Sequence, residues 1–427
     1  MKANESVKNY PSSLRMYTNY TVREIKKVCQ TIGPREPGSE SERKAQEHFA
    51  EEMKTCCDEV KVEDFKMSKY AFMGWVVVDG ICLILAVLFS FLKLPAVSLA
   101  LTIVALVCLF AEFLMYWEFL DPIFPKSMSC NTIGRRAPTG EVKKRIIFSG
   151  HADSAYEWTY THLGGKGLLF AVAIYAIVGM LYLIAVSIIT LVAGKEDAPA
   201  WLTVLQYVQL AFVPGFIAIL FFSNFKRPVM GANDDLTGAV SAIAVLKYLA
   251  DNDIRFENTE VVAITTGCEE AGLRGAKAFT KAHLDELNAV PTVFYSMDTL
   301  KDYEDMAIYN RDMTGTVKND ERVCALMKKG AELAGLDLPY ASVYLGATDA
   351  ARVSKLGVPA ATLSAMNPGP PRYYHTRGDV VEELNQKTVE KCLDVTLQSL
   401  FIYDEYGLCD NYDEVEVPVK PVSPKSK

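Results

Sequence analysis

Acidic and histidine side chains gather where predicted strands end or a predicted helix begins. In chain order the groups are His151-Ala-Asp153, Gly231-Ala-Asn-Asp234-Asp235, Glu269-Glu270, Asp298 and Tyr374-His375. Imidazole nitrogen and carboxylate oxygen are ligands of zinc, and a catalytic zinc site needs about three protein ligands plus an open position. Five candidate ligands with one shared carboxylate suit two metal ions lying close together. The set therefore predicts a catalytic metal centre.

Each group by itself has an ordinary structural explanation. A His-x-Asp after a strand can be a surface pair, and a Glu-Glu pair can favour the dipole of a helix. Asn233-Asp234-Asp235 can be no more than a helix N-cap. The combination in this order, with each group at such a junction, is far more specific and favours a metal centre.

With these motifs the chain resembles the M28 zinc aminopeptidases, co-catalytic enzymes whose chain order is His-x-Asp, Gly-Ala-x-Asp, Glu-Glu, Asp, His. The resemblance covers essentially all of the globular part of the chain. Its segments run from Ile32-Gly-Pro-Arg35-Glu-Pro-Gly-Ser39 through Glu269-Glu-Ala-Gly-Leu-Arg-Gly275, Gly346-Ala-Thr-Asp349 and Gly357-Val-Pro-Ala360 to Tyr374-His375-Thr. Two hydrophobic hairpins, described below, depart from the ordinary secreted members.

Carried over residue by residue, the resemblance implies two Zn²⁺ ions per chain. His151 and Asp298 would complete one zinc site, Glu270 and His375 would complete the other, and Asp234 would bridge them. A peptide carbonyl polarised by one metal and attacked by hydroxide on the other is the chemistry that such a pair supports.

Other side chains have expected roles around these ligands. Asp235 is the alternative bridging ligand, although the spacing to the following Thr-Gly favours its neighbour. Asp153 would accept the far ring N–H of the first histidine and fix its tautomer. Glu269 is not tied up as a ligand, so it is the expected general base, which passes a proton from water to the departing amine. Tyr374 is expected either to hydrogen-bond the developing oxyanion or simply to pack, and Asp349 to form a turn or cap.

The predicted function is that of a zinc-dependent exopeptidase, an aminopeptidase that removes N-terminal residues from peptides. A different amide hydrolase or a carboxypeptidase on the same scaffold is the first alternative, because the ligands specify the hydrolytic machinery and not the substrate. A non-catalytic binding or assembly protein is the second. The presence of every expected ligand and of the base argues against that second alternative.

The elements that must position these residues alternate between strands and helices. Predicted helices are 22–32, 40–54, 236–250, 273–282, 318–334 and 386–403, and predicted strands are 60–65, 131–135, 145–150, 261–266, 292–297, 306–310 and 360–363. Ser39 with Glu42 three residues later forms a capping box at the start of the second helix. The alternation predicts an α/β three-layer sandwich with a mostly parallel central sheet, in which ligands bind beyond the carboxyl ends of the strands.

Four apolar runs interrupt this pattern. They are Ala71–Leu92, Leu94–Ala111, Gly167–Val192 and Trp201–Phe222. Each approaches the ~20 residues with which a helix crosses a bilayer, and a buried soluble helix would instead show a polar face. We expect two transmembrane hairpins, 71–120 and 167–223, inserted into one discontinuous domain formed by 1–70, 121–166 and 224–410.

The charges beside the hairpins predict their orientation. Lysine and arginine gather next to the helix ends on the globular side, whereas the two far loops carry only Lys93 and Lys195. Positive residues accumulate on the cytoplasmic side, so the globular domain is expected to be cytoplasmic. Because the second hairpin lies between His151 and Asp234, we expect the membrane near the active site and a membrane-derived peptide as substrate. Hairpins that serve only as an anchor are an equal alternative.

Composition sets further limits. The net charge of −8 disfavours nucleic acid as a partner, because no basic stripe is present. Ten scattered cysteines without paired spacing fit a reducing compartment. The last segment, 411–427, has no periodicity and is expected to be a disordered tail. The sequence does not predict the oligomeric state.

Overall fold

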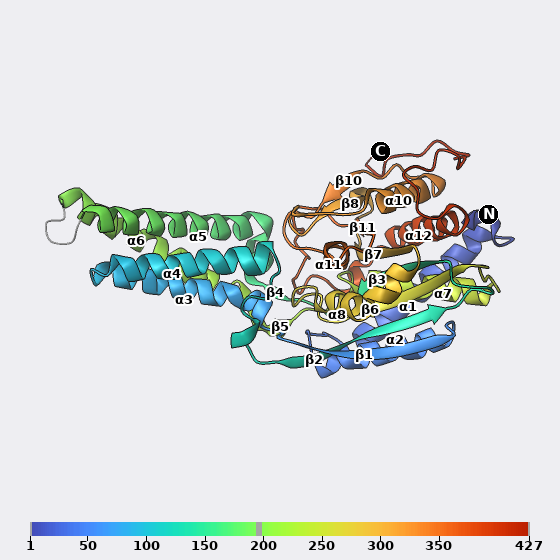
Figure 1. Ribbon diagram of the computed structural model, residues 1–427, viewed down its shortest axis with the longest axis horizontal. Coiled ribbons are helices and arrows are strands. Elements are labelled where there is room, and N and C mark those ends of the chain that lie inside the picture. Colours follow the sequence, from blue (N-terminus) through green and yellow to red (C-terminus); the bar gives the residue numbers. More distant parts are fainter. Residues whose placement is uncertain (1, 194–198, 426–427) are drawn as a thin grey trace. The chain divides into compact units, whose positions relative to one another are not determined.

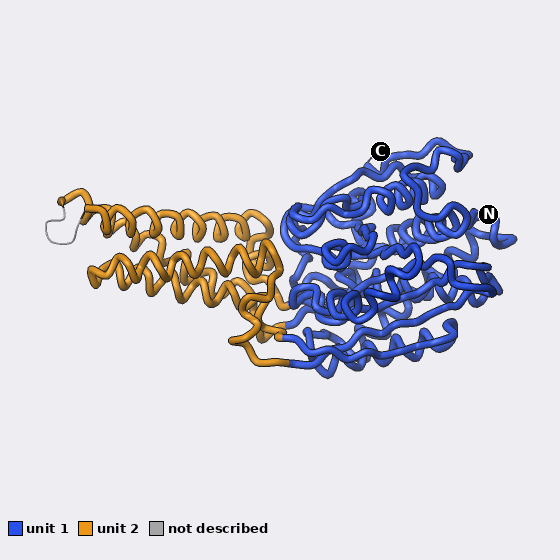
Figure 2. Tube along the Cα trace, in the orientation of Figure 1, with its two compact units in different colours: residues 1–67, 127–155, 228–427 blue, residues 68–126, 156–227 orange. Residues whose placement is uncertain are grey.

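The computed structural model describes residues 2–193 and 199–425 and divides into two compact units. Unit 1 comprises residues 1–67, 127–155 and 228–427, and unit 2 comprises residues 68–126 and 156–227 (Figure 2). Both hydrophobic hairpins therefore belong to one unit. Lys195, which the orientation argument uses, lies outside the described residues.

Unit 1 is built on a nine-stranded mixed sheet (Figure 1). Its strands are β1 (Glu59–Met67), β2 (Ser127–Arg136), β3 (Lys144–His151), β6 (Thr259–Thr266), β7 (Thr292–Leu300), β8 (Met306–Asp312), β9 (Val317–Lys318), β10 (Tyr340–Ser342) and β11 (Ala360–Ala365). The order is β1-β2-β6-β3-β7-β11-β8-β10, with β9 beside β8. The four central strands, β6, β3, β7 and β11, are parallel to one another, and β1 and β2 extend the sheet in antiparallel pairs.

Helices cover both faces of this sheet, which confirms the predicted α/β sandwich. They are α1 (Tyr10–Thr31), α2 (Glu40–Lys54), α7 (Leu236–Asp251), α8 (Arg274–Ala282), α9 (Leu284–Ala289), α10 (Glu321–Leu333), α11 (Asp349–Lys355) and α12 (Gln386–Tyr406). Ile146 and Phe148 of β3 pack in a cluster with α1, α2, α7, α10 and α12, whereas Ile147 between them packs with α8, α9 and α11. The period of two follows from the alternation of side chains along a strand.

Helix α1 begins at Tyr10, well before the predicted start at Val22. The Asn9 side chain accepts the N–H of Ser12, and Pro11 lies in the first turn, where a missing N–H costs little. The extension was missed because its buried face, apart from Leu14, consists of Tyr17 and other hydroxyl-bearing residues. Helix α2 has the predicted bounds.

Unit 2 contains four helices long and apolar enough to span a membrane. They are α3 (Ala71–Phe91), α4 (Pro95–Cys108), which continues as a π-helical segment (Leu109–Leu114), α5 (Thr159–Ala193) and α6 (Ala200–Ile219). All four contribute to one small apolar cluster that includes Leu83, Ala105, Leu183 and Phe216. A two-stranded sheet of β4 (Tyr156–Trp158) and β5 (Ser223–Pro228) brings together the ends of α5 and α6. This unit starts earlier than predicted, at Ser68 and Tyr156.

The C-terminal segment differs from the expected disordered tail. Residues 411–425 contain no helix, but Tyr412 and Val415 are buried in the core of unit 1. The main chain of Val422 forms a bridge with Leu336. Two buried apolar side chains and one backbone bridge hold the described part of this segment against unit 1. Composition does not reveal these contacts.

Candidate metal centre

The predicted ligands lie on strand ends and adjoining loops of unit 1. His151 ends β3, Glu270 follows β6, and Asp298 lies near the end of β7. These three strands are neighbours and parallel, so their carboxyl ends share one edge of the sheet. Asp234 precedes α7, and His375 lies in the loop after β11. The fold therefore brings together residues that are far apart in the sequence.

Asp234 lies at the centre of the group. Its Oδ1 lies 3.1 Å from Nε2 of His151, and its Oδ2 lies 3.2 Å from Nε2 of His375. The same Nε2 of His375 is 3.2 Å from Oε2 of Glu270. The carboxylate of Asp234 is thus shared between two sets of side chains.

Two sets of three side chains have the spacing of metal ligands. Ligand atoms of His151, Asp234 and Asp298 lie within 4.8 Å of one another, and the same holds for Asp234, Glu270 and His375. These are the two groups that the sequence resemblance implies. A third set, which joins Glu269 to His151 and Glu270, meets the same limit.

The centre is buried and acidic, which suits a cation. Glu270 Oε1 is buried and, within the described residues, accepts no hydrogen bond. Burial and the charge of Asp234 raise the pKa of Asp298 to about 7. Carboxylates crowded out of water cannot all ionise unless positive charge is supplied. Divalent ions held by these oxygen and imidazole nitrogen atoms would supply it, so the side chains fit zinc.

Glu269, the expected general base, lies beside the candidate ligand His151. Its Oε2 lies 3.9 Å from His151 Nε2. Burial, followed by the charges of Glu270, Asp349 and Asp298, raises the pKa of Glu269 well above its ordinary range against the opposing effect of His151. A carboxyl group in such surroundings is suited to hold and release a proton.

The Asp235 carboxylate accepts main-chain N–H groups. Its Oδ1 accepts the N–H groups of Gly238 at 2.9 Å and Thr299 at 3.0 Å. Its Oδ2 accepts the N–H of His151 at 3.1 Å. The Asp235 carboxylate thus caps α7 and connects it to β3 and β7. It makes no approach like that of Asp234 to both histidines.

Asp153 supports the acidic loop as well as the first histidine. Its Oδ1 is 3.4 Å from Nδ1 of His151, while its main-chain oxygen is closer to that nitrogen, at 3.2 Å. The two carboxylate oxygens accept the N–H groups of Glu269 and Glu270, each at 3.0 Å. The predicted contact with the histidine is therefore accompanied by a stronger link to the loop that carries the expected base.

Two further carboxylates were not assigned roles in the site from the sequence. Asp379 accepts the N–H of Asn233 at 2.8 Å and that of Asp234 at 3.0 Å. Glu42 accepts the N–H groups of Gly38 and Cys268, both at 2.7 Å. The capping box pointed to Glu42 only as part of a helix start. Its bond to Cys268, next to Glu269, joins segments too distant in the sequence for a local pattern to reveal.

Tyr374 lies flat against a candidate ligand. Its ring stacks on that of His375 with centroids 3.8 Å apart and an angle of 24° between the planes. A side chain at Gly346 would approach the tyrosine hydroxyl. The contact gives Tyr374 a clear packing function. Its expected bond to an oxyanion remains a prediction.

Asp349 is more than the predicted turn or cap residue. It begins α11, but its side chain is buried and accepts the hydroxyl of Thr266 at the end of β6. Its charge also acts on the pKa of Glu269. Asp349 therefore belongs to the acidic surroundings of the centre.

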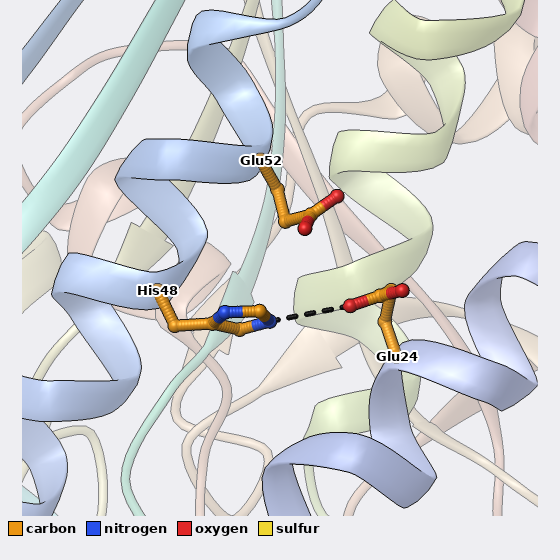
Figure 3. A group of neighbouring side chains, drawn as sticks. All are labelled: Glu24, His48 and Glu52. Atoms are coloured by element: carbon orange, nitrogen blue, oxygen red, sulfur yellow. Dashed lines mark ion pairs between the residues drawn. The ribbon is translucent and has the colours of Figure 1, made fainter.

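A second group with metal-like composition, Glu24, His48 and Glu52, lies between α1 and α2 (Figure 3). His48 Nε2 is 3.3 Å from Glu24 Oε2. The ammonium group of Lys27, however, lies 3.3 Å from the Glu24 carboxylate and 3.6 Å from that of Glu52. Lys27 thus supplies the positive charge that a metal would bring, and the group is an ion-pair network between two helices.

Comparison with known proteins identifies the fold and one sequence family. The model of peptidase family M28 matches residues 217–400. An aminopeptidase from Aneurinibacillus sp. strain AM-1 superposes with a TM-score of 0.54 at 13% identity, over 96% of this chain and 98% of its own. A zinc aminopeptidase from Bacillus subtilis gives 0.52 at 13%, over 93% of this chain and 98% of its own. A search among curated proteins gives no match.

One similar structure carries a different name. A glutaminyl cyclase from an Acidobacteriales bacterium superposes with a TM-score of 0.54 at 12% identity, over 92% of this chain and 96% of its own. At these identities the likeness shows a shared fold. Since proteins named for different reactions share that fold, the activity has to be argued from the site.

Proposed function

Because the model of peptidase family M28 matches residues 217–400, we propose that the chain is a dizinc exopeptidase that removes N-terminal residues from peptides. The observation that carries the proposal is the orientation of Asp234. Its two oxygens face the two histidines, each of which lies in a separate set of three potential ligands. A shared carboxylate between two such sets suits a pair of metal ions lying close together.

The proposed ligand sets follow this geometry. His151 and Asp298 would hold one zinc ion, Glu270 and His375 the other, and Asp234 both. When bound, the ions would supply Lewis acidity to the scissile carbonyl and to the attacking water. Asp153 and Asp379 would keep the ligand-bearing segments in place through the main-chain bonds described above.

Glu269 is proposed to move the proton. Its carboxylate takes a proton from the attacking water as the new C–O bond forms. It then gives that proton to the amine nitrogen as the C–N bond breaks, so that the carboxylate is restored. The bonds from Asp153 to the N–H groups of Glu269 and Glu270 would hold the base beside the ligands.

The acidic character of the centre favours a substrate with a free α-amine. Glu269, Asp349 and Asp153 add buried carboxylates to those of the ligands. With divalent ions balancing the ligand carboxylates, these additional carboxylates would remain as partners for a positively charged N-terminus and would repel a C-terminal carboxylate. They support an aminopeptidase over a carboxypeptidase.

Metal analysis joined to a peptide digest tests the proposal. Purified protein should contain two zinc ions per chain and release the first residue from peptides with a free amine, while acetylated peptides stay intact. Cleavage of acetylated peptides would favour another amide hydrolase. Loss of ammonia from N-terminal glutamine without hydrolysis would favour a cyclase. Protein that binds no metal and changes no peptide would support a binding role.

We propose further that unit 2 anchors the protein in a membrane. Its helices expose large apolar side chains, among them Ile81, Leu88, Ile174, Leu181 and Val204. Its polar side chains point inward, where Gln209 donates to Ser90 and Ser187 donates to Ser98. A helical bundle in water has the reverse arrangement, because water solvates polar side chains and lipid does not.

The charge distribution supports a cytoplasmic unit 1. Lys66, Lys69, Lys126, Lys226 and Arg227 lie in the chain beside the ends of the apolar helices that continue into unit 1. The described far-side turn between α3 and α4 carries Lys93. Positive residues near helix ends are retained on the cytoplasmic side.

A further inference from the structure

The guanidinium group of Arg35 is completely buried, and its bonds to the described residues all go to main-chain carbonyl oxygens. The bonds are Nε to Ala152 O at 2.6 Å, Nη1 to Gly33 O at 3.0 Å and Met230 O at 2.8 Å, and Nη2 to Gly231 O at 2.9 Å. A planar group with several fixed donors can hold several carbonyl groups at once, which an ammonium group on a flexible chain cannot reproduce.

Three of these carbonyl groups belong to two segments that carry candidate ligands. Ala152 directly follows His151, and Met230 and Gly231 precede Asp234. One guanidinium group therefore connects the segments that supply the first histidine and the shared carboxylate.

Ser154 strengthens the same connection. The Arg35 N–H donates to Ser154 Oγ, and the Ser154 N–H donates to Arg35 O, each at 2.9 Å. Ser154 Oγ in turn donates to the carbonyl of Val229 at 2.9 Å, and the Val229 N–H donates to Ala155 O at 2.9 Å. The two segments are thus joined by side-chain and main-chain bonds that run through Arg35 and Ser154.

Close packing at Gly231 fits this network. Its φ is +60°, and a Cβ at this position would lie 2.6 Å from Ser154 Cβ and 3.0 Å from Arg35 Nη2. Glycine allows both the left-handed backbone and the short approach. The network leaves no room for a larger residue.

The network lies at the two ends of the second insertion. Between Ala155 and Pro228 the chain leaves unit 1 and forms residues 156–227 of unit 2. The β4–β5 pair joins the two ends of this excursion within unit 2. Within unit 1, the bonds of Arg35 and Ser154 hold the two flanking ligand segments relative to each other.

We propose that Arg35 is a positioning residue that clamps the two ends of the second insertion and so holds the ligand segments at 151–155 and 229–234 in register. The inference rests on the proposed metal-dependent function. It adds a role for a motif residue that contacts no substrate and coordinates no metal. The positive charge of the clamp also lies among buried carboxylates that repel one another.

A comparison of two arginine-to-lysine variants tests the clamp. R35K keeps the positive charge but replaces the planar guanidinium group and its several fixed N–H donors with an ammonium group. R136K is the matched control, because Arg136 is also a largely buried arginine of unit 1 and donates to the carbonyls of Ile254 and Cys56. The full-length proteins, freed of metal, are titrated with Co²⁺ and followed by visible absorption. Hydrogen exchange of the metal-free proteins is measured by mass spectrometry.

R35K is expected to bind Co²⁺ about 10–100-fold more weakly than wild type, the range seen when support of metal ligands is removed. It should also exchange amides of 151–155 and 229–234 faster, whereas R136K changes neither measurement. Equal Co²⁺ affinity and equal exchange in R35K and wild type would overturn the clamp.

A milder variant covers the possibility that R35K does not fold. S154A keeps Arg35 and removes the hydroxyl that links it to Val229, so it should show the same faster exchange at 229–234 to a smaller extent. Unchanged exchange in S154A would then contradict the clamp. Wild-type protein that binds no Co²⁺ would overturn the proposed metal function instead, and the exchange of the metal-free proteins would still decide the clamp.

Discussion

Asp234 and Asp235 are adjacent in the chain, yet their carboxylates face different kinds of partner. Asp234 directs its oxygens at two imidazole rings, at 3.1 and 3.2 Å. Asp235 directs its oxygens at main-chain N–H groups of α7, β7 and β3. One of the pair is therefore available to metal, and the other holds together the elements on which the ligands lie.

This difference predicts distinct losses on replacement of each residue by asparagine. D234N should lose both metal ions, because the shared ligand is weakened in both sites. D235N should retain metal-binding groups but unfold more easily, by about 1–3 kcal/mol, because its amide brings an N–H group toward main-chain donors. Metal content and urea unfolding of the metal-free proteins measure the two effects. Equal metal content in D234N and wild type would contradict the shared-ligand assignment.

Replacement of Glu269 separates base from ligand. E269Q should keep two zinc ions and lower kcat by at least about 10²-fold, because glutamine cannot accept the proton from water. The control is E270Q, which should lose metal from one site. Loss of metal from E269Q would instead assign Glu269 to the coordination sphere, as its spacing to His151 allows.

The aromatic contact at Tyr374 predicts a difference between two variants. Y374F keeps the ring that stacks on His375, so metal affinity should be unchanged. If the Tyr374 hydroxyl bonds the oxyanion, kcat of Y374F should fall. Y374A removes the stacking and should weaken metal binding as well. Metal titration and steady-state kinetics distinguish the two. Full activity in Y374F would remove the case for oxyanion contact.

Glu42 should make the stability of unit 1 depend on pH. Burial raises the pKa of Glu42 from an ordinary value of 4.5 to about 8. Between these values the folded protein retains a proton that the unfolded chain has released, so the contribution to stability falls as pH rises through this interval. The slope is at most about 1.4 kcal/mol per pH unit for one proton.

The E42Q variant tests this assignment. Glutamine does not titrate, so the unfolding free energy of wild type should fall relative to that of E42Q as the pH rises from 5 to 8. Urea unfolding of metal-free proteins at several pH values gives the difference. A pH-independent difference would show that Glu42 is ionised throughout or that another residue dominates.

The membrane proposal predicts which residues are reached from outside the cell. A cysteine introduced at Lys93, in the exposed turn between α3 and α4, should react with an impermeant maleimide on intact cells. The wild type is the control, because its own cysteines lie within unit 1 or the apolar helices. Labelling only after permeabilisation would reverse the topology.

Much of unit 1 could be predicted from local patterns. The period of two around Ile146–Phe148 and the N-cap at Ser39 depend only on residues a few positions apart, and both are present in the structure. Local patterns failed at the start of α1, where most buried residues are tyrosines and threonines, and at Tyr412, which is held by distant segments.

The sequence by itself determined the types and order of the candidate ligands, the alternation of strands and helices, and the four apolar spans. These properties depend on residue chemistry and short-range periodicity. Only the tertiary structure decided that Asp234 faces both histidines, that Asp235 faces the main chain, and that Arg35 joins the two ends of the second insertion. Such relationships arise from hydrogen bonds between segments separated by up to hundreds of residues, and no pattern within one segment records them.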